Sequence, residues 1–593
     1  MEKPKEEEMT QKTDTDNGHA ICLQGVLKFL NQKQMEREVA KVIPNASAVF
    51  KPKNKPFCFV LFKTEEEKEE FMGSNQKVKI KNREARVRDS NSNINTFKKG
   101  MDQRRKERKI MESKQNRVSK IYTDVREKIA PYWQMEYKEQ LALKENGCKA
   151  IYEKIAEKVI GNRERFTGDD EKWLELYKQY KQDNTKTEFF NNFKEISFVD
   201  NWKDSPRNKI ECTFGNSDKG IVLGFILNII QSKLEISNDF SIDTIDNVMV
   251  GFMKKIEGMA NLLRQENEGK HDFSAYDNSI KSGFFRNVVL RKSQVKKELV
   301  AKLVINSAKD DDRYSLLITL LKNNLSEGFM DDHKLVGFVV ETYDGISNVI
   351  PNVKENQLMV CGTRDYVFDV FLDKNFKIPL DGFFQIHKLM AEMMFKKIEK
   401  LLNLDENTIL LDVCAGTGAF GITLGEKSKE IVFIEMESSA CNMIKDNLLL
   451  NWALEDEKNQ QQDSQTDSDN KNTVFSFNDK KFRIYNQKIE DCISEIHSLY
   501  SGKDMRIVAI VDPPRAGLHP KVVKSLRTFK GVDELVFVSC DFKQAKQNII
   551  DLCAEETKRV RGPPFSPVEV YPFDIFPLTP HFETVIYLKR FYG

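Results

Sequence analysis

Residues 407–424 read NTILLDVCAGTGAFGITL. An apolar run typical of a buried strand leads into a glycine-rich turn, and a second apolar stretch predicts a helix after it. Gly416, Gly418 and Gly421 satisfy the G-x-G-x-x-G spacing, which indicates that a ligand approaches the backbone where the strand ends. The pattern predicts the first strand, turn and helix of a Rossmann-like α/β sheet.

The next predicted strand, EIVFIE, ends on Glu435. A carboxylate at that position can accept hydrogen bonds from two ribose hydroxyls. NAD and S-adenosylmethionine both carry such a ribose, so these residues leave both ligands open. From residue 380 onward apolar strands alternate with helical segments, which is typical of a parallel sheet with crossover helices.

A second stretch, IVAIVDPPRAGLHPKVV (507–523), narrows the choice. Its apolar strand ends in Asp512, two prolines and Arg515. Proline cannot donate to a sheet ladder, so the segment leaves the sheet at its carboxyl edge, where open parallel sheets bind ligands. Methyltransferases that act on exocyclic amines carry an aromatic residue at the fourth position, and Arg515 therefore argues against amine methylation.

A third strand, within ELVFVSCDFKQA (534–545), ends on a lone cysteine, Cys540. A buried cysteine often acts as a small core hydrophobe. At a strand tip on the ligand edge it can instead serve as a nucleophile, provided that an electropositive setting helps to ionise it. Arg515 is a candidate for that setting.

The bulk composition bounds the class of protein. The 593 residues suffice for about three to four domains. The net charge is only +2, but residues 77–120 hold 16 Lys and Arg against 5 Asp and Glu. That excess suits a nucleic acid, and a solvated basic helix is the alternative reading.

Ten cysteines without a CxxC pair argue against a disulfide scaffold and against a zinc cluster, so no metal is expected. The acidic start, MEKPKEEEMTQKTDTD, lacks the apolar region of a signal peptide. The apolar run GIVLGFILNII is too short to span a bilayer. We expect a protein of the cytosol, the nucleus or both, without a membrane partner; the oligomeric state stays open.

Residues 20–90 predict the order strand, helix, strand, strand, helix, strand. That order resembles an RNA-recognition motif, and KPFCFVLF (55–62) can be aligned with its RNP1 pattern. Strand alternation places Phe57 and Phe59 on one face, where rings can stack on bases, and Val60 and Phe62 in the core. Pro56 and Cys58 replace the expected small residues, and protein binding is the alternative function.

Several longer stretches resemble the eukaryotic tRNA (uracil-5-)-methyltransferases with an N-terminal RNA-recognition motif. They are SPRNKIECTFG (205–215), SAYDNSIKSGFFRNVVLR (274–291), DGFFQIH (381–387), LLDVCAGTGAFG (410–421), DPPRAGLHPKV (512–522), VSC (538–540) and PFDIFPLTPHFETVIYLKR (572–590). The resemblance implies S-adenosylmethionine as the cofactor, tRNA as the partner and a T-loop uridine as the target.

The resemblance also assigns roles to single residues. Cys540 matches the family's nucleophile and Glu583 its base. The expected cofactor contacts are Gln385, Glu435 and Asp512, with the turn residues Cys414, Gly416 and Gly418. The expected RNA contacts are Phe57, Phe59 and Arg515.

Three positions depart from the family pattern. Asp541-Phe542 replaces the usual Asn-Pro after the nucleophile, and a carboxylate beside a thiol disfavours the thiolate. His387 stands where asparagine is usual, and Ala415 stands where many relatives have a second cysteine.

The predicted fold is α/β, with a class I (Rossmann-like) methyltransferase core, a mixed α/β middle region and an N-terminal α+β RNA-recognition-motif-like domain. The predicted boundaries are a disordered tail (1–18), the RNA-recognition-motif-like domain (19–92), a charged helical linker (93–195), a mixed α/β central RNA-binding region (196–378), and the methyltransferase domain (379–593) with a polar insertion (454–473).

Three other functions are weighed against tRNA uridine methylation. A ribosomal RNA uracil-5 methyltransferase shares the core, but many of those carry a four-cysteine iron–sulfur cluster that this sequence lacks. An NAD-dependent oxidoreductase leaves Cys540, Glu583 and the DPPR segment without a role. A catalytically weak tRNA-folding or tRNA-binding protein is favoured by Asp541-Phe542.

Overall fold

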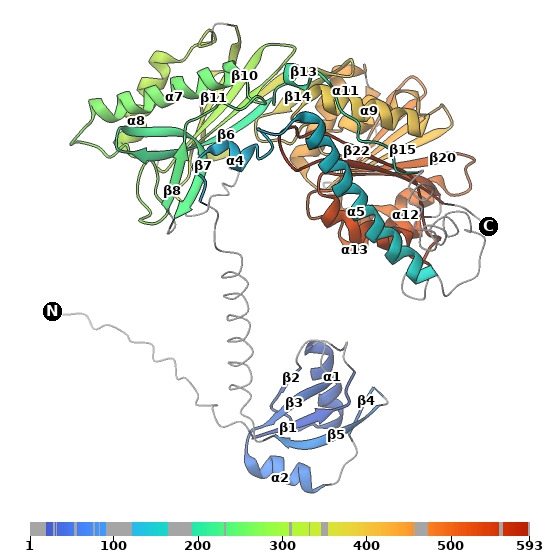
Figure 1. Ribbon diagram of the computed structural model, residues 1–593. Helices are drawn as coiled ribbons and strands as arrows, with labels where there is room; N and C mark the ends of the chain where they lie inside the picture. Colours follow the sequence, from blue (N-terminus) through green and yellow to red (C-terminus); the bar gives the residue numbers. More distant parts are fainter. Residues whose placement is uncertain are drawn as a thin grey trace, which may run out of the picture. The chain divides into compact units, whose positions relative to one another are not determined.

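The chain forms two compact units, Met1–Ile121 and Tyr122–Gly593, which are described separately (Figure 1). The computed structural model describes residues 19–27, 30, 32–51, 56–74, 78–81, 83–90, 121–163, 192–230, 233–307, 311–330, 332–345, 354–453, 455–456, 472–529, 531–556 and 561–590. The predicted tail, most of the basic segment 77–120 and most of the polar insertion 454–473 lie outside these residues.

The first unit is an antiparallel five-stranded sheet with two helices. The strand order is β2-β3-β1-β5-β4. Its elements are β1 (His19–Gln24), α1 (Gln32–Val42), β2 (Ala48–Phe50), β3 (Phe57–Phe62), α2 (Glu65–Gly73), β4 (Val78–Ile80) and β5 (Arg83–Ser90). The predicted order of elements is confirmed, with the short β4 as an addition. That this unit is an RNA-recognition motif stays a prediction.

Strand β3 alternates as predicted. Val60 and Phe62 pack into the core with residues of α1, whereas Phe57 and Phe59 belong to a smaller cluster on the other face. Phe57 is half-buried, but Phe59 is only 6% exposed, and the rings of Phe50 and Phe57 lie with their centroids 6.5 and 5.7 Å from its own. Phe59 therefore offers little ring surface to a base in this conformation.

The middle region is a seven-stranded sheet of order β12-β11-β10-β9-β6-β7-β8. Its strands are β6 (Lys209–Ser217), β7 (Gly220–Ile230), β8 (Lys233–Ser237), β9 (Phe285–Lys292), β10 (Glu298–Ile305), β11 (Lys334–Thr342) and β12 (Gln357–Gly362). Helices α7 (Asn247–Glu266) and α8 (Asp312–Asn324) cover one face and supply a continuous apolar core (Figure 1). A hairpin of β13 (Tyr366–Phe371) and β14 (Lys374–Pro379) follows.

The C-terminal sheet has nine strands in the order β17-β18-β19-β16-β15-β20-β21-β23-β22. The strands are β15 (Thr408–Val413), β16 (Glu430–Glu435), β17 (Glu455–Asp456), β18 (Asn472–Phe477), β19 (Lys480–Asn486), β20 (Arg506–Val511), β21 (Val532–Ser539), β22 (Ser566–Phe573) and β23 (Glu583–Lys589). Strands β19, β16, β15, β20 and β21 run parallel, and β23 runs antiparallel to β21. The predicted parallel sheet is confirmed.

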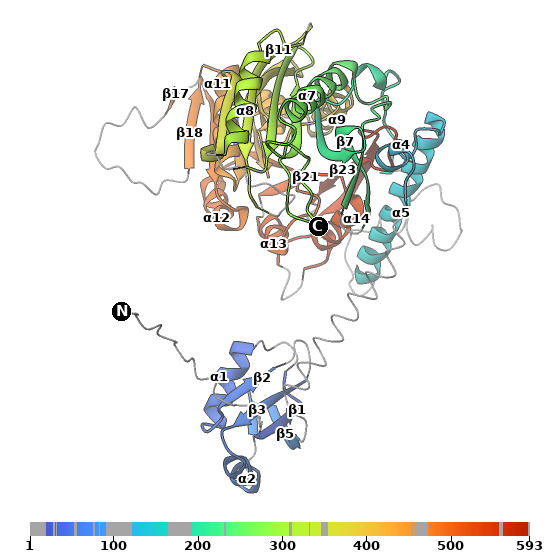
Figure 2. The same cartoon turned by 90° about the vertical axis from the view of Figure 1, so that its left-hand side faces the viewer.

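Helices cover both faces of this sheet (Figure 2). One face packs against α9 (Lys388–Leu402), α10 (Ala419–Leu424) and α11 (Ser438–Asn451). The other face packs against α12 (Ile489–Tyr500), α13 (Pro520–Thr528) and α14 (Phe542–Cys553). With both faces buried, the strands carry near-continuous apolar runs, which is why the sequence signal for them is strong.

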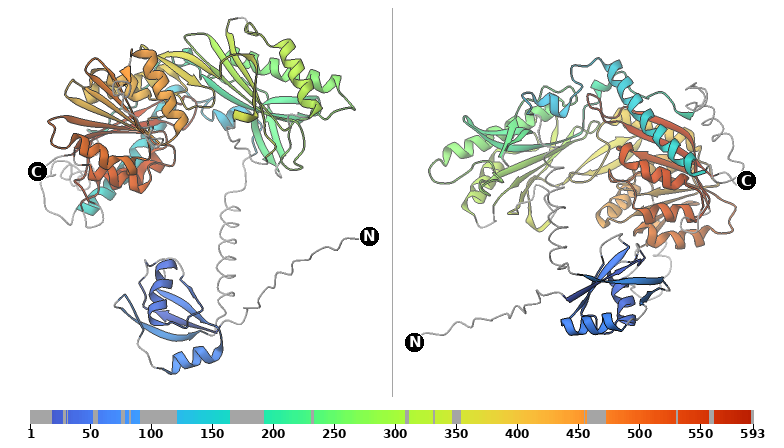
Figure 3. Two further views of the ribbon diagram at one scale, coloured as in Figure 1. Left: turned by 180° about the vertical axis from the view of Figure 1, so that it is seen from behind. Right: turned by 60° about the horizontal axis from the view of Figure 1, so that its bottom comes forward.

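Of the predicted linker 93–195, residues 121–163 are largely helical, whereas Phe193 pairs with Val570 of β22. Helices α4 (Val125–Ile129) and α5 (Tyr137–Arg163) belong to the second unit. α5 runs beside α14 and adds buried residues to the core on that face (Figure 3).

No helix among the described residues is long and apolar enough to cross a membrane. Within the same residues, no group of three or more His, Cys, Asp or Glu side chains is placed to hold a metal ion.

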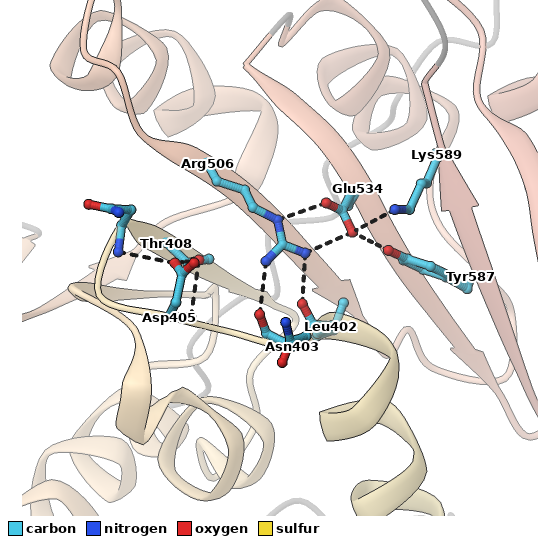
Figure 4. Close-up of polar contacts among 9 residues, drawn as sticks. Leu402, Asn403, Asp405, Thr408, Arg506, Glu534, Tyr587 and Lys589 are labelled. Carbon is cyan, nitrogen blue, oxygen red and sulfur yellow. Dashed lines mark hydrogen bonds and ion pairs between the residues drawn. The ribbon is translucent and has the colours of Figure 1, made fainter.

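An ionic network pins the amino edge of the sheet (Figure 4). Arg506, which begins β20, donates to both carboxylate oxygens of Glu534 at 2.7 and 2.9 Å. It also donates to the Leu402 carbonyl at 2.7 Å, where α9 ends. Tyr587 donates to Glu534 as well. The network ties α9, β20, β21 and β23 together at the edge opposite the glycine turn.

Replacing Arg506 by methionine should lower the free energy of unfolding of the second unit by about 2–4 kcal/mol, because a partly buried carboxylate and two helix-end carbonyls lose their donor. Urea denaturation followed by tryptophan fluorescence measures this unit, since all four tryptophans lie after residue 121. Lys589→Met is the matched control: its ammonium lies 3.6 Å from Glu534 and is 37% exposed, so the loss should stay below about 1 kcal/mol. Equal losses in the two variants would contradict this reading.

Candidate active site

The glycine turn leaves β15 in a backbone conformation that exposes it to a ligand. Cys414, Gly416 and Gly418 all have positive φ angles, at 62°, 56° and 78°. A side chain added at Gly416 would meet no atom within 4 Å, so the space beside this turn is open. A side chain at Gly421 would collide with the ring of Phe433, so the third glycine serves close packing of α10 on the sheet.

Three carboxylates gather around this turn. Glu435 accepts a hydrogen bond from the Gly416 amide at 3.0 Å, and Asp412 accepts one from the Gly421 amide at 2.8 Å. Burial raises the pKa of Asp412 to about 8 and that of Asp512 to about 7. Burial, followed by the charges of these carboxylates, raises the pKa of Cys414 to about 12, so this thiol stays neutral. A positively charged ligand beside this open turn would favour the charged forms of these carboxyl groups.

The segment that carries Gln385 is docked on the middle region. Asn208 donates to the Gln385 carbonyl at 2.8 Å. Arg291, which is almost fully buried, donates to the Gly382 carbonyl at 2.6 Å, and Lys302 forms a 2.8 Å ion pair with Asp381. The middle sheet thereby fixes a segment that the sequence predicts to contact the cofactor.

Cys540 and Glu583 meet at the carboxyl edge because their strands pair. Ser539 of β21 lies opposite Thr584 of β23, so the next residues along the two strands, Cys540 and Glu583, are neighbours. Cys540 is half-buried, whereas Glu583 is 6% exposed. Within the described part of the chain, Glu583 Oε1 has no hydrogen-bond partner.

The electrostatics of this pair are set by burial and by two charges. Burial, and then the carboxylates of Glu583 and Asp512, raise the pKa of the Cys540 thiol to about 11. Arg515 opposes this shift through its charge and a hydrogen bond to the thiol. Burial and the charge of Asp512 raise the pKa of Glu583 well above its ordinary value. Glu583 is therefore a carboxyl group that holds a proton firmly once it has taken one.

Asp541 has a structural role at the start of α14. Its carboxylate accepts a hydrogen bond from the Gln544 amide at 3.1 Å and caps α14. The charges that raise the pKa of Cys540 are those of Glu583 and Asp512. Asp541, which replaces the asparagine of the family pattern, therefore acts as a helix cap. Aspartate and asparagine are equally suited to this role.

The other two departures are also structural. His387 is buried, and its Nδ1 lies 3.1 Å from the Ser205 carbonyl. Burial lowers its pKa to about 4, so the ring is neutral and joins the start of α9 to the middle region. Ala415 is part of the apolar core.

The structure brings most of the predicted site residues to one sheet edge: Cys414, Gly416, Gly418, Glu435, Asp512, Arg515, Cys540 and Glu583. Phe57 and Phe59 lie in the first unit, and their relation to this edge stays a prediction.

Sequence reasoning missed Asn548, which holds the loop that carries Arg515. From α14 its side chain donates to the Leu518 carbonyl at 2.9 Å and accepts from the Leu518 amide at 2.8 Å. A side chain on Gly517 would collide with it. An asparagine in a helix gives no sequence signal for such a long-range pair.

The strand order, the glycine turn and the carboxylate that ends β16 define a class I methyltransferase core. Residues 315–591 match the family model described as tRNA (Uracil-5-)-methyltransferase. Over these residues the chain is similar to the tRNA (uracil-5-)-methyltransferase family.

Curated relatives carry the same family name. The chain is 26% identical to mouse (Mus musculus) tRNA (uracil-5-)-methyltransferase homolog A over 79% of its own length and 69% of that protein. It is 34% identical to human homolog B (Homo sapiens), over 38% of this chain and 40% of that protein. It spans about a third of human homolog A, with 32% identity. A solved Pyrococcus abyssi tRNA (uracil-54, C5)-methyltransferase in complex with S-adenosyl-L-homocysteine gives a TM-score of 0.46 at 19% identity, covering 76% of this chain and 83% of that one.

The raised pKa of Cys540 predicts a slow thiol in the free protein. Alkylation of Cys540 by iodoacetamide should accelerate by roughly tenfold per pH unit between about pH 7 and pH 10, because only the thiolate reacts. Arg515→Gln removes the cation that lowers this pKa, so alkylation at a given pH should be slower. Mass spectrometry of the Cys540 peptide measures both rates; a rate that is already constant above pH 7 would contradict the assignment.

Proposed function

We propose that this protein transfers a methyl group from S-adenosylmethionine to carbon 5 of a uridine in the T-loop of tRNA. The observation that carries the proposal is the meeting of Cys540, Arg515 and Glu583 beside the acidic glycine turn. The proposed location is the cytosol, the nucleus or both.

Cys540 is the proposed nucleophile. Carbon 5 of uracil is too poor a nucleophile to take a methyl group unaided. The Cys540 thiolate adds to carbon 6, which moves the electron pair of the C5–C6 double bond into an enolate with charge at carbon 5. Arg515 favours the thiolate, whereas burial and two carboxylates oppose it. Added positive charge beside the glycine turn would assist ionisation of the thiol.

The cofactor fits the turn by charge and by space. Glu435 is placed to take the ribose hydroxyls, and the open side of Gly416 leaves room for the ligand. Burial raises the pKa values of Asp412 and Asp512, and a sulfonium or ammonium group beside them would favour their charged carboxylate forms. When bound, S-adenosylmethionine supplies an electrophilic methyl group.

Glu583 is the proposed base. After methylation, carbon 5 carries both the new methyl group and a proton. Glu583 takes this proton, the C5–H electron pair re-forms the C5–C6 double bond, and the C6–S bond breaks to release the Cys540 thiolate. The unpaired Oε1 and the raised pKa of Glu583 both support this role.

The RNA has to present an unstacked base. Flipping a T-loop uridine out of its stack costs roughly a few kcal/mol, which phosphate contacts can offset. The basic segment 77–120 is the proposed source of such contacts. On the first unit, Arg88 lies opposite Cys22, which in turn lies opposite Phe59, so an arginine borders the aromatic cluster. This juxtaposition supports RNA as the partner of that face.

Glu435→Ala should weaken binding of S-adenosylmethionine by about 1–3 kcal/mol, the scale of a lost charge-assisted hydrogen bond. Isothermal titration calorimetry measures this loss. Glu437→Ala is the control, because that carboxylate lies two residues further along on an exposed position. Unchanged affinity in Glu435→Ala, or tight binding of NAD by the wild-type protein, would refute the cofactor assignment.

Incubation with tRNA and S-adenosylmethionine should convert uridine to 5-methyluridine, which mass spectrometry of tRNA nucleosides detects. Cys540→Ala should give neither product nor adduct. Glu583→Gln should add to carbon 6 and carry the methyl group, then stall without a base, so a methyl-labelled protein–tRNA band should survive denaturing electrophoresis. Normal turnover by Glu583→Gln would refute the assignment of Glu583 as the base. The absence of 5-methyluridine after incubation with wild-type protein would refute the proposed reaction.

A further inference from the structure

The connection between β22 and β23, residues 574–582, leads directly into Glu583. It contains Leu578 with a φ of 64°, a conformation that a leucine adopts only when its surroundings enforce it. The groups that hold this connection come from residues 132–148, far away in the sequence, which form the start of α5 and the turn before it.

A buried ion pair anchors the beginning of the connection. Lys144 Nζ lies 2.6 Å from Asp574 Oδ1, and both side chains have no exposed surface. The same ammonium donates to the Phe576 carbonyl at 2.9 Å. Tyr137 donates its hydroxyl to the other oxygen of Asp574 at 2.9 Å. One carboxylate therefore receives two donors from one helix face.

The middle of the connection is held by backbone pairing. The Tyr132 amide donates to the Leu578 carbonyl at 2.9 Å, and the Gln140 side chain accepts from the Leu578 amide at 3.1 Å. The strained residue thus has both of its backbone polar groups bonded to the segment before or within α5. These bonds offset the cost of its left-handed conformation.

The end of the connection touches the same helix. Cys148 lies with its sulfur 3.7 Å from the Thr584 hydroxyl, and Gly147 approaches the Phe582 ring, so α5 contacts the residues on both sides of Glu583. From Asp574 to Thr584 the connection follows this helix. The position of the Glu583 carboxylate is therefore set by α5 and not by the sheet alone.

We propose that Tyr137 and Lys144 of α5 are positioning residues for Glu583, which hold its carboxylate where it can take the carbon 5 proton. The inference rests on the proposed function, because it presupposes the role of Glu583. It assigns a role in the reaction to α5, which lies outside both sheets.

The expected consequence is a selective loss of one step. Cys540 directly follows β21, whose pairing with β20 and β23 does not depend on the contacts of α5 with the connection. Addition to carbon 6 should therefore continue, whereas proton removal should slow, since a displacement of about 1 Å can cost up to a hundredfold in rate. General destabilisation would instead reduce every step together.

The test compares three variants with wild-type protein. Tyr137→Phe removes one donor to Asp574 with little change in volume. The double variant Lys144→Met with Asp574→Asn removes both buried charges together, which avoids an unpaired charge in the core. Lys138→Met, on an exposed position of the same helix, is the matched control. The measurements are kcat, KM for tRNA and the fraction of methyl-labelled adduct on denaturing gels, with thermal melting as a check on folding.

We expect kcat to fall roughly tenfold in Tyr137→Phe and up to a hundredfold in the double variant, with KM for tRNA nearly unchanged. The adduct should accumulate in the same order, as it does in Glu583→Gln, and Lys138→Met should match wild type. If Glu583→Gln accumulates adduct but a folded double variant does not, the positioning role is refuted while the proposed function stands. If wild-type protein makes no 5-methyluridine, the proposed function fails first.

Discussion

Parallel pairing of β16, β15, β20 and β21 is the constraint on which the rest of the structure depends. Val413 of β15 pairs with Ile434 of β16 and with Val511 of β20, and Val511 pairs with Phe537 of β21. All four strands therefore end at the same edge of the sheet. Whatever follows each strand must then lie in one place. Glu435 ends β16, the glycine turn follows β15, the DPPR segment follows β20, and Cys540 follows β21. These groups form one site although they lie far apart in the sequence.

The charge balance of that edge explains how it can be selective. Carboxyl groups outnumber the one cation, Arg515, among the residues brought together there. Burial raises the pKa of Asp412, Asp512 and Glu583, so their charged forms are favoured when a cation lies beside them. Such an edge attracts a cationic ligand. Burial, and then the charges of Glu583 and Asp512, raise the pKa of the Cys540 thiol, so this thiol stays protonated at neutral pH in the free protein. Reactivity of the thiol is thereby coupled to the positive charge that a ligand brings.

Regions outside the Rossmann-like sheet hold the flanks of the site. The middle sheet fixes the Gln385 segment through Asn208, Arg291 and Lys302, and α5 fixes the approach to Glu583 through Lys144. The Arg506–Glu534 network joins strands β20 and β21 at the opposite edge, where it contributes to stability. Strand pairing therefore fixes one side of the site. Long-range polar contacts fix the segments beside it that are not paired as strands.

The sequence by itself determined the elements with a strong local pattern. Buried parallel strands give apolar runs, glycines mark the turn, and Cys540, Asp512 and Glu435 could be assigned to strand ends, because strand direction fixes the edge at which a strand finishes. Tertiary structure alone decided the rest. That the carboxylate of Asp541 caps α14, and that the ring of Phe50 lies beside that of Phe59, is seen only in the folded chain. The contact of α5 with the segment before Glu583 depends on Lys144 and Asp574, which lie 430 positions apart and leave no periodic signal in either stretch.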